Sequence, residues 1–314
     1  MRHILAIIAF LVAAAVQAQD YPVRPLKLVV PIGPGGGTDI LARHMAQKMG
    51  ERLRRSAIVE NRPGAGTILG TEYVAKAAPD GYTLLVGGIF NMVMNKALVK
   101  SLPYEPVRDF VPLGYISAYP FALVARADLP PTLPEFVQYA KQRPGKLSYG
   151  SAGLGTLQHV WGTILVKSLG LDLVHVPFKA APAVHQEMLA GRIDLMMDNL
   201  SAVKHHIQAG RLKAYAVSSR TSHLEGVRTL KESGVDFEGE SWFAMFAPAA
   251  TPSGIVSTLR GVIAEVLRDA DFASRVEKDG GRVLAIAPAE QAKFLQDEIE
   301  RWAALVTQYG VAVD

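Results

Sequence analysis

The chain has 314 residues and no cysteine, and its 33 Lys and Arg residues outnumber 29 Asp and Glu residues, which gives a net charge of +4. The absence of cysteine excludes a disulfide scaffold, thiolate metal sites and a cysteine nucleophile. The cations are scattered singly among acidic residues, so no nucleic-acid-binding surface, which needs clustered Lys and Arg, is expected.

The first residues have the features of a secretory signal peptide. Arg2 and His3 precede an apolar run at 4–16, and the segment 16–18 fits the small-x-small pattern of a signal-peptidase site. The run is shorter than the roughly 20 apolar residues that a membrane-spanning helix needs. We therefore expect residues 1–18 to be removed and the mature protein to lie in the periplasm.

From Leu26 onward the pattern alternates between strands and helices. The first unit has expected strands at 26–32, 57–61 and 82–88 and expected helices at 38–53 and 67–77. A glycine-rich loop, GPGGG, joins the first strand to the first helix. Strands that alternate with helices favour a parallel sheet flanked by helices.

The same order returns after Pro144. Strand and glycine loop (146–155), helix (156–170), strand (171–176), a helix through Met188 and strand (192–198) make up a second unit. The helix at 156–170 carries apolar residues at i, i+3, i+4, i+7, i+8 and i+12, which predicts a face directed at the core. These residues are Leu157, Val160, Trp161, Ile164, Leu165 and Leu169.

Two such units predict an α/β protein with two lobes, each a mostly parallel sheet flanked by helices. We expect lobe 1 to consist of 19–122 plus 243–314 and lobe 2 of 123–242, with the crossovers between them near 121–126 and 238–248. Helices expected at 253–269 and 288–310 would cover lobe 1. Ligands of open parallel sheets bind beyond the carboxyl ends of the strands, so a shared cleft between the lobes is the expected site.

Both glycine loops lead into helices, whose first N–H groups are unpaired and carry partial positive charge. Such a loop holds an anion without any charged side chain, because glycine lets the ligand approach the backbone. A plain strand-to-helix turn is the alternative for each loop. The expected ligand-binding residues are Gly35, Gly36, Gly37 and Thr38 in the first loop and Ser151, Gly153, Gly155 and Thr156 in the second.

Four further residues are candidates next to these loops. Asp39 begins the first helix, where its structural role would be to cap the helix and its functional role would be to contact an ammonium or hydroxyl group of the ligand. His159 lies in the first turn of the second helix and either meets the ligand or packs against the helix. Asp198 and, more weakly, Asn91 stand at the ends of cleft strands, and buried hydrogen bonding is the alternative for both.

Nucleotide and hydrolase motifs are absent from the sequence. Gly155 is followed by Thr156 without the lysine of a phosphate-binding loop, and Tyr149 replaces the first glycine of GxSxG before Ser151. We therefore predict no catalytic residue, no metal site and no cofactor. An exported enzyme that uses Ser151 with His159, and a sensory module that presents its closed form, stay open as alternatives.

The sequence resembles the Bug-type substrate-binding proteins of the tripartite tricarboxylate transporter family. The matching segments run through nearly the whole mature chain and include YPVRPLKLVVPIGPGGGTD, VENRPGAG, YGSAGLGTLQH, VPFKAAPA, LAGRIDLMMDN and SWFAMFAPAATP. The resemblance implies a two-lobed periplasmic binding fold of the type with two crossovers (type II-like). It also implies a ligand carboxylate held by the loops 33–39 and 150–156, and a position near the ligand for Asp198.

The resemblance further implies a non-catalytic receptor that delivers a small carboxylate to the membrane subunits of a tripartite transporter; we expect it to be a monomer. Some positions depart from the family pattern. Phe178 and Ala180 stand where a Tyr-Lys-Gly segment is common, and Thr163 replaces a frequent glutamate. Ala180 is therefore expected at a more apolar, less open ligand face in lobe 2.

Overall fold

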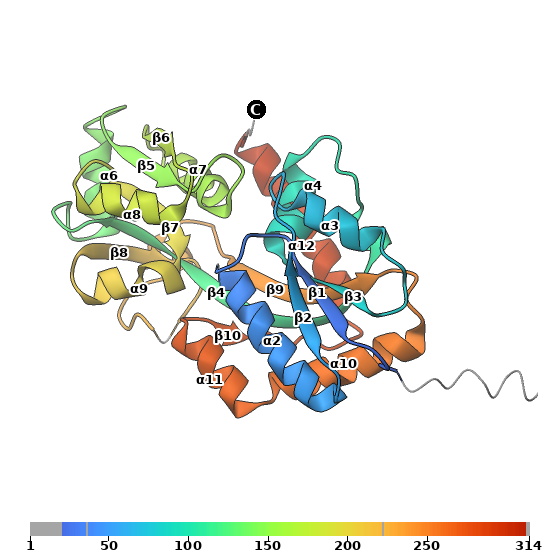
Figure 1. Ribbon diagram of the computed structural model, residues 1–314. Helices are drawn as coiled ribbons and strands as arrows, with labels where there is room; N and C mark the ends of the chain where they lie inside the picture. The colour runs from blue at the N-terminus through green and yellow to red at the C-terminus, as the bar shows by residue number, and fades with distance from the viewer. Residues whose placement is uncertain (1–20, 36, 222, 312–314) are drawn as a thin grey trace, which may run out of the picture.

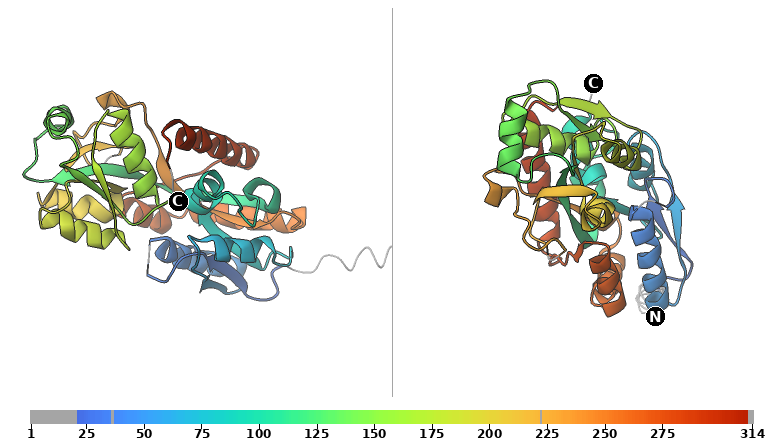
Figure 2. Two further views of the ribbon diagram at one scale, coloured as in Figure 1. Left: turned by 90° about the horizontal axis from the view of Figure 1, so that it is seen from above. Right: turned by 90° about the vertical axis from the view of Figure 1, so that its left-hand side faces the viewer.

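The structure, a computed structural model, describes residues 21–35, 37–221 and 223–311. The expected signal peptide at 1–18 and the candidate Gly36 lie outside the described residues. Strands and helices form two α/β halves that lie side by side (Figures 1 and 2). No helix within the described ranges is long and apolar enough to cross a membrane.

The first half is built on strands β1 (Leu26–Val30), β2 (Ala57–Asn61) and β3 (Thr83–Gly88), which pair in parallel in the order β2-β1-β3. Strand β9 (Glu240–Pro248) continues this sheet antiparallel to β3. Strand β1 is almost entirely buried, as expected for a parallel strand covered by helices on both faces.

The second half repeats the parallel arrangement. Strands β5 (Ser148–Ser151), β6 (Val174–Pro177) and β7 (Leu195–Asn199) pair in the order β6-β5-β7. Strand β8 (Leu212–Val217) lies beyond them. The expected strands of both units are therefore present.

Strand β4 (Phe110–Arg126) passes from one sheet into the other. Its residues 110–120 pair with β9, whereas from Phe121 onward it pairs with β7 and β8. The expected crossover at 121–126 is thus the end of a much longer strand. Because β4 and β9 run antiparallel to their neighbours, and β10 (Arg282–Val283) does too, each sheet is mixed: its parallel strands are continued by antiparallel ones.

Helices cover both sheets (Figure 1). Those of the first half are α2 (Gly37–Leu53), α3 (Ile68–Ala75), α4 (Asn95–Leu98), α5 (Pro106–Asp109), α10 (Ser253–Leu267) and α11 (Ala270–Lys278). Those of the second half are α6 (Leu133–Lys141), α7 (Leu157–Ser168), α8 (Ala181–Leu189) and α9 (Leu200–Gln208). On α7 the predicted core face is buried, apart from the half-buried Leu169 just beyond its end.

Helix α12 (Gln291–Gln308) contacts both halves, although the sequence predicted that it would cover only the first. Its Trp302 stacks on Trp161 of α7, with ring centroids 5.2 Å apart and an interplanar angle of 3°. Both indoles are completely buried. The largest apolar cluster therefore runs through both halves and joins them on one side of the cleft.

Candidate ligand-binding cleft

A cavity of about 300 Å³ lies between the two halves. Both glycine-loop helices reach it, because Thr38 of α2 and Leu157 of α7 are among its walls. The first half and the crossing strands contribute Pro31, Ile32, Thr38, Thr67, residues 86–91, Phe121 and residues 241–243, and the second half contributes residues 156–158 and Asn199. The carboxyl ends of β3 and β7 open onto it, as expected for parallel strands.

No Lys, Arg, Asp or Glu is among the described residues that line this cavity. The polar groups of its lining residues are neutral: backbone amides at the start of α2 and α7, threonine hydroxyls and the side-chain amides of Asn91, Gln158 and Asn199. Apolar groups, among them Phe90 and Phe243, form the remaining walls. Within the described ranges, no group of three or more His, Cys, Asp or Glu residues is arranged to hold a metal ion.

The start of α7 is shaped by glycines and a threonine cap. Gly153 and Gly155 have φ angles of +122° and +76°, a conformation that residues with a Cβ rarely adopt. The Thr156 hydroxyl donates to the Gly153 carbonyl (2.7 Å) and accepts from the backbone N–H of His159 (3.4 Å). The next two residues, Leu157 and Gln158, line the cavity, and N–H groups in a first helical turn have no intrahelical acceptor.

Two histidines fix the loop behind this helix start. The Gly155 N–H donates to Nδ1 of His159 (3.1 Å), and Ser151 Oγ bonds Nε2 of His175 (2.8 Å). The two imidazoles stack with centroids 4.4 Å apart. Burial lowers the pKa of both rings, that of His175 to about 4 with a further contribution from His159, so both are neutral at pH 7.

Ser151 therefore pairs with His175, and not with His159 as the alternative of an exported enzyme would require. The Ser151 side chain is fully buried at the end of β5. A substrate carbonyl has no access to its Oγ, so the pair stabilises the loop and is not arranged for nucleophilic attack.

The start of α2 is held by Asp39. Its buried carboxylate accepts hydrogen bonds from the Gly35 N–H (2.9 Å), from the Arg43 guanidinium (2.9 and 3.0 Å) and from Asn61 (2.9 Å). Burial alone would raise the pKa of Asp39, but these hydrogen bonds more than offset it and hold the value at about 2. Asp39 thus shapes the loop and does not line the cavity.

Asn91, also of the first half, lines the cavity, and two hydrogen bonds hold its side chain in place. Its Oδ1 accepts from the Gly88 N–H (2.8 Å) and its Nδ2 donates to Thr71 (3.0 Å). Beside it, Thr67 has a left-handed backbone (φ 76°) before α3, and its hydroxyl accepts from Asn95 (3.1 Å). The sequence predicted a turn that ends at Gly66 and a helix from Thr67 onward, and Thr67 was not among the predicted site residues.

Asp198 lies behind the cavity. It is 1% exposed, bonds His185 Nε2 (2.7 Å) and accepts from the Gln158 amide (3.0 Å). It therefore orients a side chain that lines the cavity. Ala180, an exposed residue just before α8, is not among the lining residues.

Of the predicted site residues, Thr38, Asn91 and Thr156 line this cavity. Gly37 lines a neighbouring cavity instead. The other described candidates are not among the lining residues: Gly35, Asp39, Ser151, Gly153, Gly155, His159, Ala180 and Asp198. Lining residues that the sequence analysis did not select include Thr67, Phe90, Gln158, Ser241 and Phe243.

The family model described as "Tripartite tricarboxylate transporter family receptor" matches residues 41–311 of this chain. The chain is 32% identical over 320 residues to the protein BugT of Bordetella pertussis, covering 99% of this chain and 98% of that protein. Two solved Rhodopseudomonas palustris proteins are similar in structure. One, with adipate, has a TM-score of 0.83 and 31% identity over 93% of this chain and 99% of its own. The other, MatC with bound malate, has a TM-score of 0.79 and 33% identity over 91% of this chain and all of its own.

Proposed function

Because this chain belongs to the tripartite tricarboxylate transporter receptor family, we propose that it captures a small organic carboxylate in the cleft between its halves and presents it to the membrane subunits of such a transporter. The observation that carries the proposal is the uncharged cavity at the start of α2 and α7, with walls from both halves. Relatives with adipate and with malate support a carboxylate as the ligand.

The energetics suit reversible capture. Roughly four charge-assisted hydrogen bonds at about 1.5 to 3 kcal/mol each give ~6 to 12 kcal/mol, from which association removes at least ~4 kcal/mol. Micromolar dissociation constants follow for the stronger end of this range. A receptor that must release its ligand to a transporter needs no tighter binding.

We further propose that the halves act as lobes that close over the ligand, divided as 19–122 plus 243–314 and 123–242. Strand β4 passes from the first sheet into the second, and the chain returns to the first sheet at the start of β9; this supports hinges near Pro120 and Glu240, where the pairing of β4 with β9 ends. The N-terminal segment 1–18 would direct export to the periplasm, and the protein would act as a monomer.

The protein is a receptor and not an enzyme. The fully buried Ser151 hydroxyl agrees with this, because its histidine partner serves only to hold the loop. A sensory role, in which the closed form engages a signalling partner, would use the same cleft.

Thermal unfolding with paired ligands tests the proposal. At about 100 times the dissociation constant, a carboxylate should stabilise the protein by about 2.7 kcal/mol and raise the Tm by several degrees, while the matching neutral amide should not. Native mass spectrometry of freshly purified protein would identify a retained ligand for the panel. Equal shifts from acid and amide would contradict an anion site.

A further inference from the structure

A second cavity, of about 310 Å³, lies between α2, α9 and α11; we refer to it as the α11 chamber. Helix α9 belongs to the second half and the other two helices to the first. The chamber is lined by Gly37, Ile40, Leu41, His44, Tyr119, Asn199, Ser201, Lys204, Phe243, Arg275, Val276, Lys278 and Asp279.

The α11 chamber adjoins the ligand-binding cavity. Asn199 and Phe243 line both spaces, and Gly37 lines the chamber while the next residue, Thr38, lines the cavity. The two spaces therefore meet around the first turn of α2. A ligand held there has one end in the uncharged cavity and room to extend into the chamber.

The chamber differs from the cavity in charge. Lys204, Arg275 and Lys278 line it together with one acid, Asp279. Among the described residues, neither Arg275 nor Lys278 has a side-chain carboxylate within 4.0 Å. Both cations are exposed at the end of α11, where an anion has access to them.

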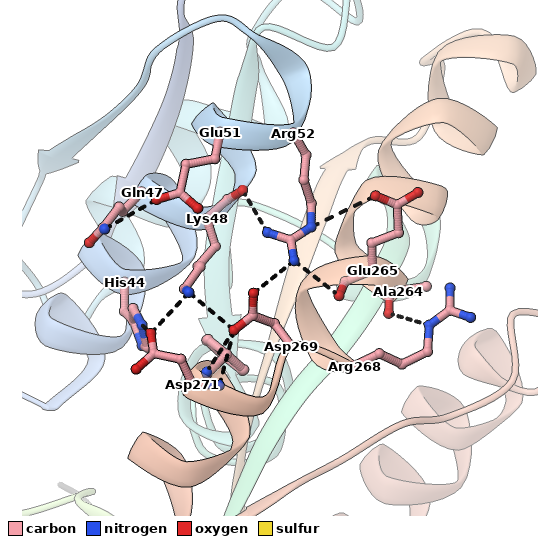
Figure 3. Close-up of polar contacts among 11 residues, drawn as sticks. His44, Gln47, Lys48, Glu51, Arg52, Ala264, Glu265, Arg268, Asp269 and Asp271 are labelled. Atoms are coloured by element: carbon pink, nitrogen blue, oxygen red, sulfur yellow. Dashed lines mark hydrogen bonds and ion pairs between the residues drawn. The ribbon is translucent and has the colours of Figure 1, made fainter.

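The acids at the start of α11, Asp269 and Asp271, form ion pairs with α2 (Figure 3). Asp269 pairs with Lys48 (3.1 Å) and Arg52 (2.9 Å) of α2, and Asp271 pairs with Lys48 (2.9 Å). These contacts fix the first turn of α11 against α2. The last turn holds Arg275, Lys278 and one acid, Glu277, which is not among the residues that line the chamber.

Lys204 connects this end of α11 to the other half. Its ammonium donates to the Lys278 carbonyl (3.0 Å), at the partly negative C-terminus of the helix. The remaining walls combine apolar residues, among them Ile40, Leu41 and Val276, with polar ones such as Asn199 and Ser201. The chamber that adjoins the ligand-binding cavity thus has three cations among its lining residues.

We propose that the α11 chamber is a subsite for the far end of the ligand, an anionic group that an apolar spacer separates from the first carboxylate. Arg275 and Lys278 bind that group, and Lys204 adds charge from the opposite half. This inference rests on the proposed function, since the first carboxylate occupies the cleft. It assigns selectivity for elongated dianions to residues on α9 and α11.

The test compares linear monocarboxylates and dicarboxylates of equal chain length, from four to eight carbons, by calorimetry. The wild type should bind the best dicarboxylate at least about 10-fold more tightly than its matched monocarboxylate. Arg275→Gln should weaken that dicarboxylate about 10-fold and leave the monocarboxylate within about twofold. Arg228→Gln is the matched control, because this exposed arginine lines neither space and its substitution changes the net charge equally.

The outcomes separate the two proposals. If the wild type binds both members of each pair equally, or if Arg275→Gln affects them equally, the subsite is wrong while the carboxylate receptor stands. If no acid of the series binds at all, the proposed function fails and the subsite with it. If Arg228→Gln weakens dicarboxylate binding as much as Arg275→Gln does, the loss reflects the net charge of the protein, and the subsite is wrong.

Discussion

Placing one negative charge in each half of the cleft tests whether both halves hold the same anion. Gly37→Asp adds a carboxylate to the first turn of α2, where a Cβ meets nothing within 4 Å. Asn199→Asp adds one at the start of α9, where the Asn199 side chain already caps the helix by accepting from the Ser201 N–H (3.1 Å). Aspartate caps as well as asparagine and suits a first turn, so both variants should fold normally.

The expected effect on binding is large. Two unit charges about 6 Å apart, at an effective dielectric constant of about 20, repel by roughly 2.8 kcal/mol. That energy corresponds to a roughly 100-fold loss of affinity for a carboxylate. Because the charges enter from opposite halves, each variant alone should show a loss of this order.

Isothermal calorimetry reads the affinity and circular dichroism the fold. Gly254→Asp is the matched control, since it adds the same charge to the first turn of α10, also without a clash, outside both cavities. If one variant abolishes binding while the other stays within about threefold of the wild type, a single half binds the ligand and the shared-cleft reasoning is refuted.

Three further predictions follow from the described contacts. Panels of esters, phosphates and amides should give no product above a Ser151→Ala control; turnover that depends on Ser151 would contradict the receptor function. Small-angle scattering should give a smaller radius of gyration on addition of a carboxylate that calorimetry confirms to bind, whereas an unchanged curve would argue against lobe closure. Asp39→Asn should destabilise the protein by about 1 to 3 kcal/mol at pH 7, because a buried, hydrogen-bonded carboxylate is lost. The depressed pKa of Asp39 means that its contribution disappears as the pH falls from its ordinary 3.8 to about 2, so urea unfolding should show the difference shrinking in that range.

The repeated strand and helix pattern was sufficient to predict most of the fold, because its apolar runs are strongly periodic. The core face of α7 was predicted correctly from spacing alone. The length and direction of β4 were not, since Pro112 and Pro120 interrupt its pattern and its pairing with β9 joins residues more than 100 positions apart. Long-range antiparallel pairing of this kind leaves little local signal.

At the site, the glycine loops led to Thr38 and Thr156 because a helix start after glycine has a local signature. The sequence did not distinguish residues that line the cavity from residues that hold the loops. Asp39 and His159 accept hydrogen bonds from the backbone N–H groups of Gly35 and Gly155. The sequence does not show in which direction a side chain points, so these internal hydrogen bonds could not be predicted. Thr67 was missed because the sequence predicted it as the first residue of a helix, which gave no indication of its left-handed backbone.

The most direct test of the central claim is a crystal structure of the protein with the carboxylate that raises its Tm the most. We expect a ligand carboxylate within hydrogen-bond distance of N–H groups from the first turns of both α2 and α7, with no lysine or arginine side chain bound to that carboxylate. A carboxylate that contacts only one half, or that lies outside the cavity between Thr38 and Thr156, would contradict the account.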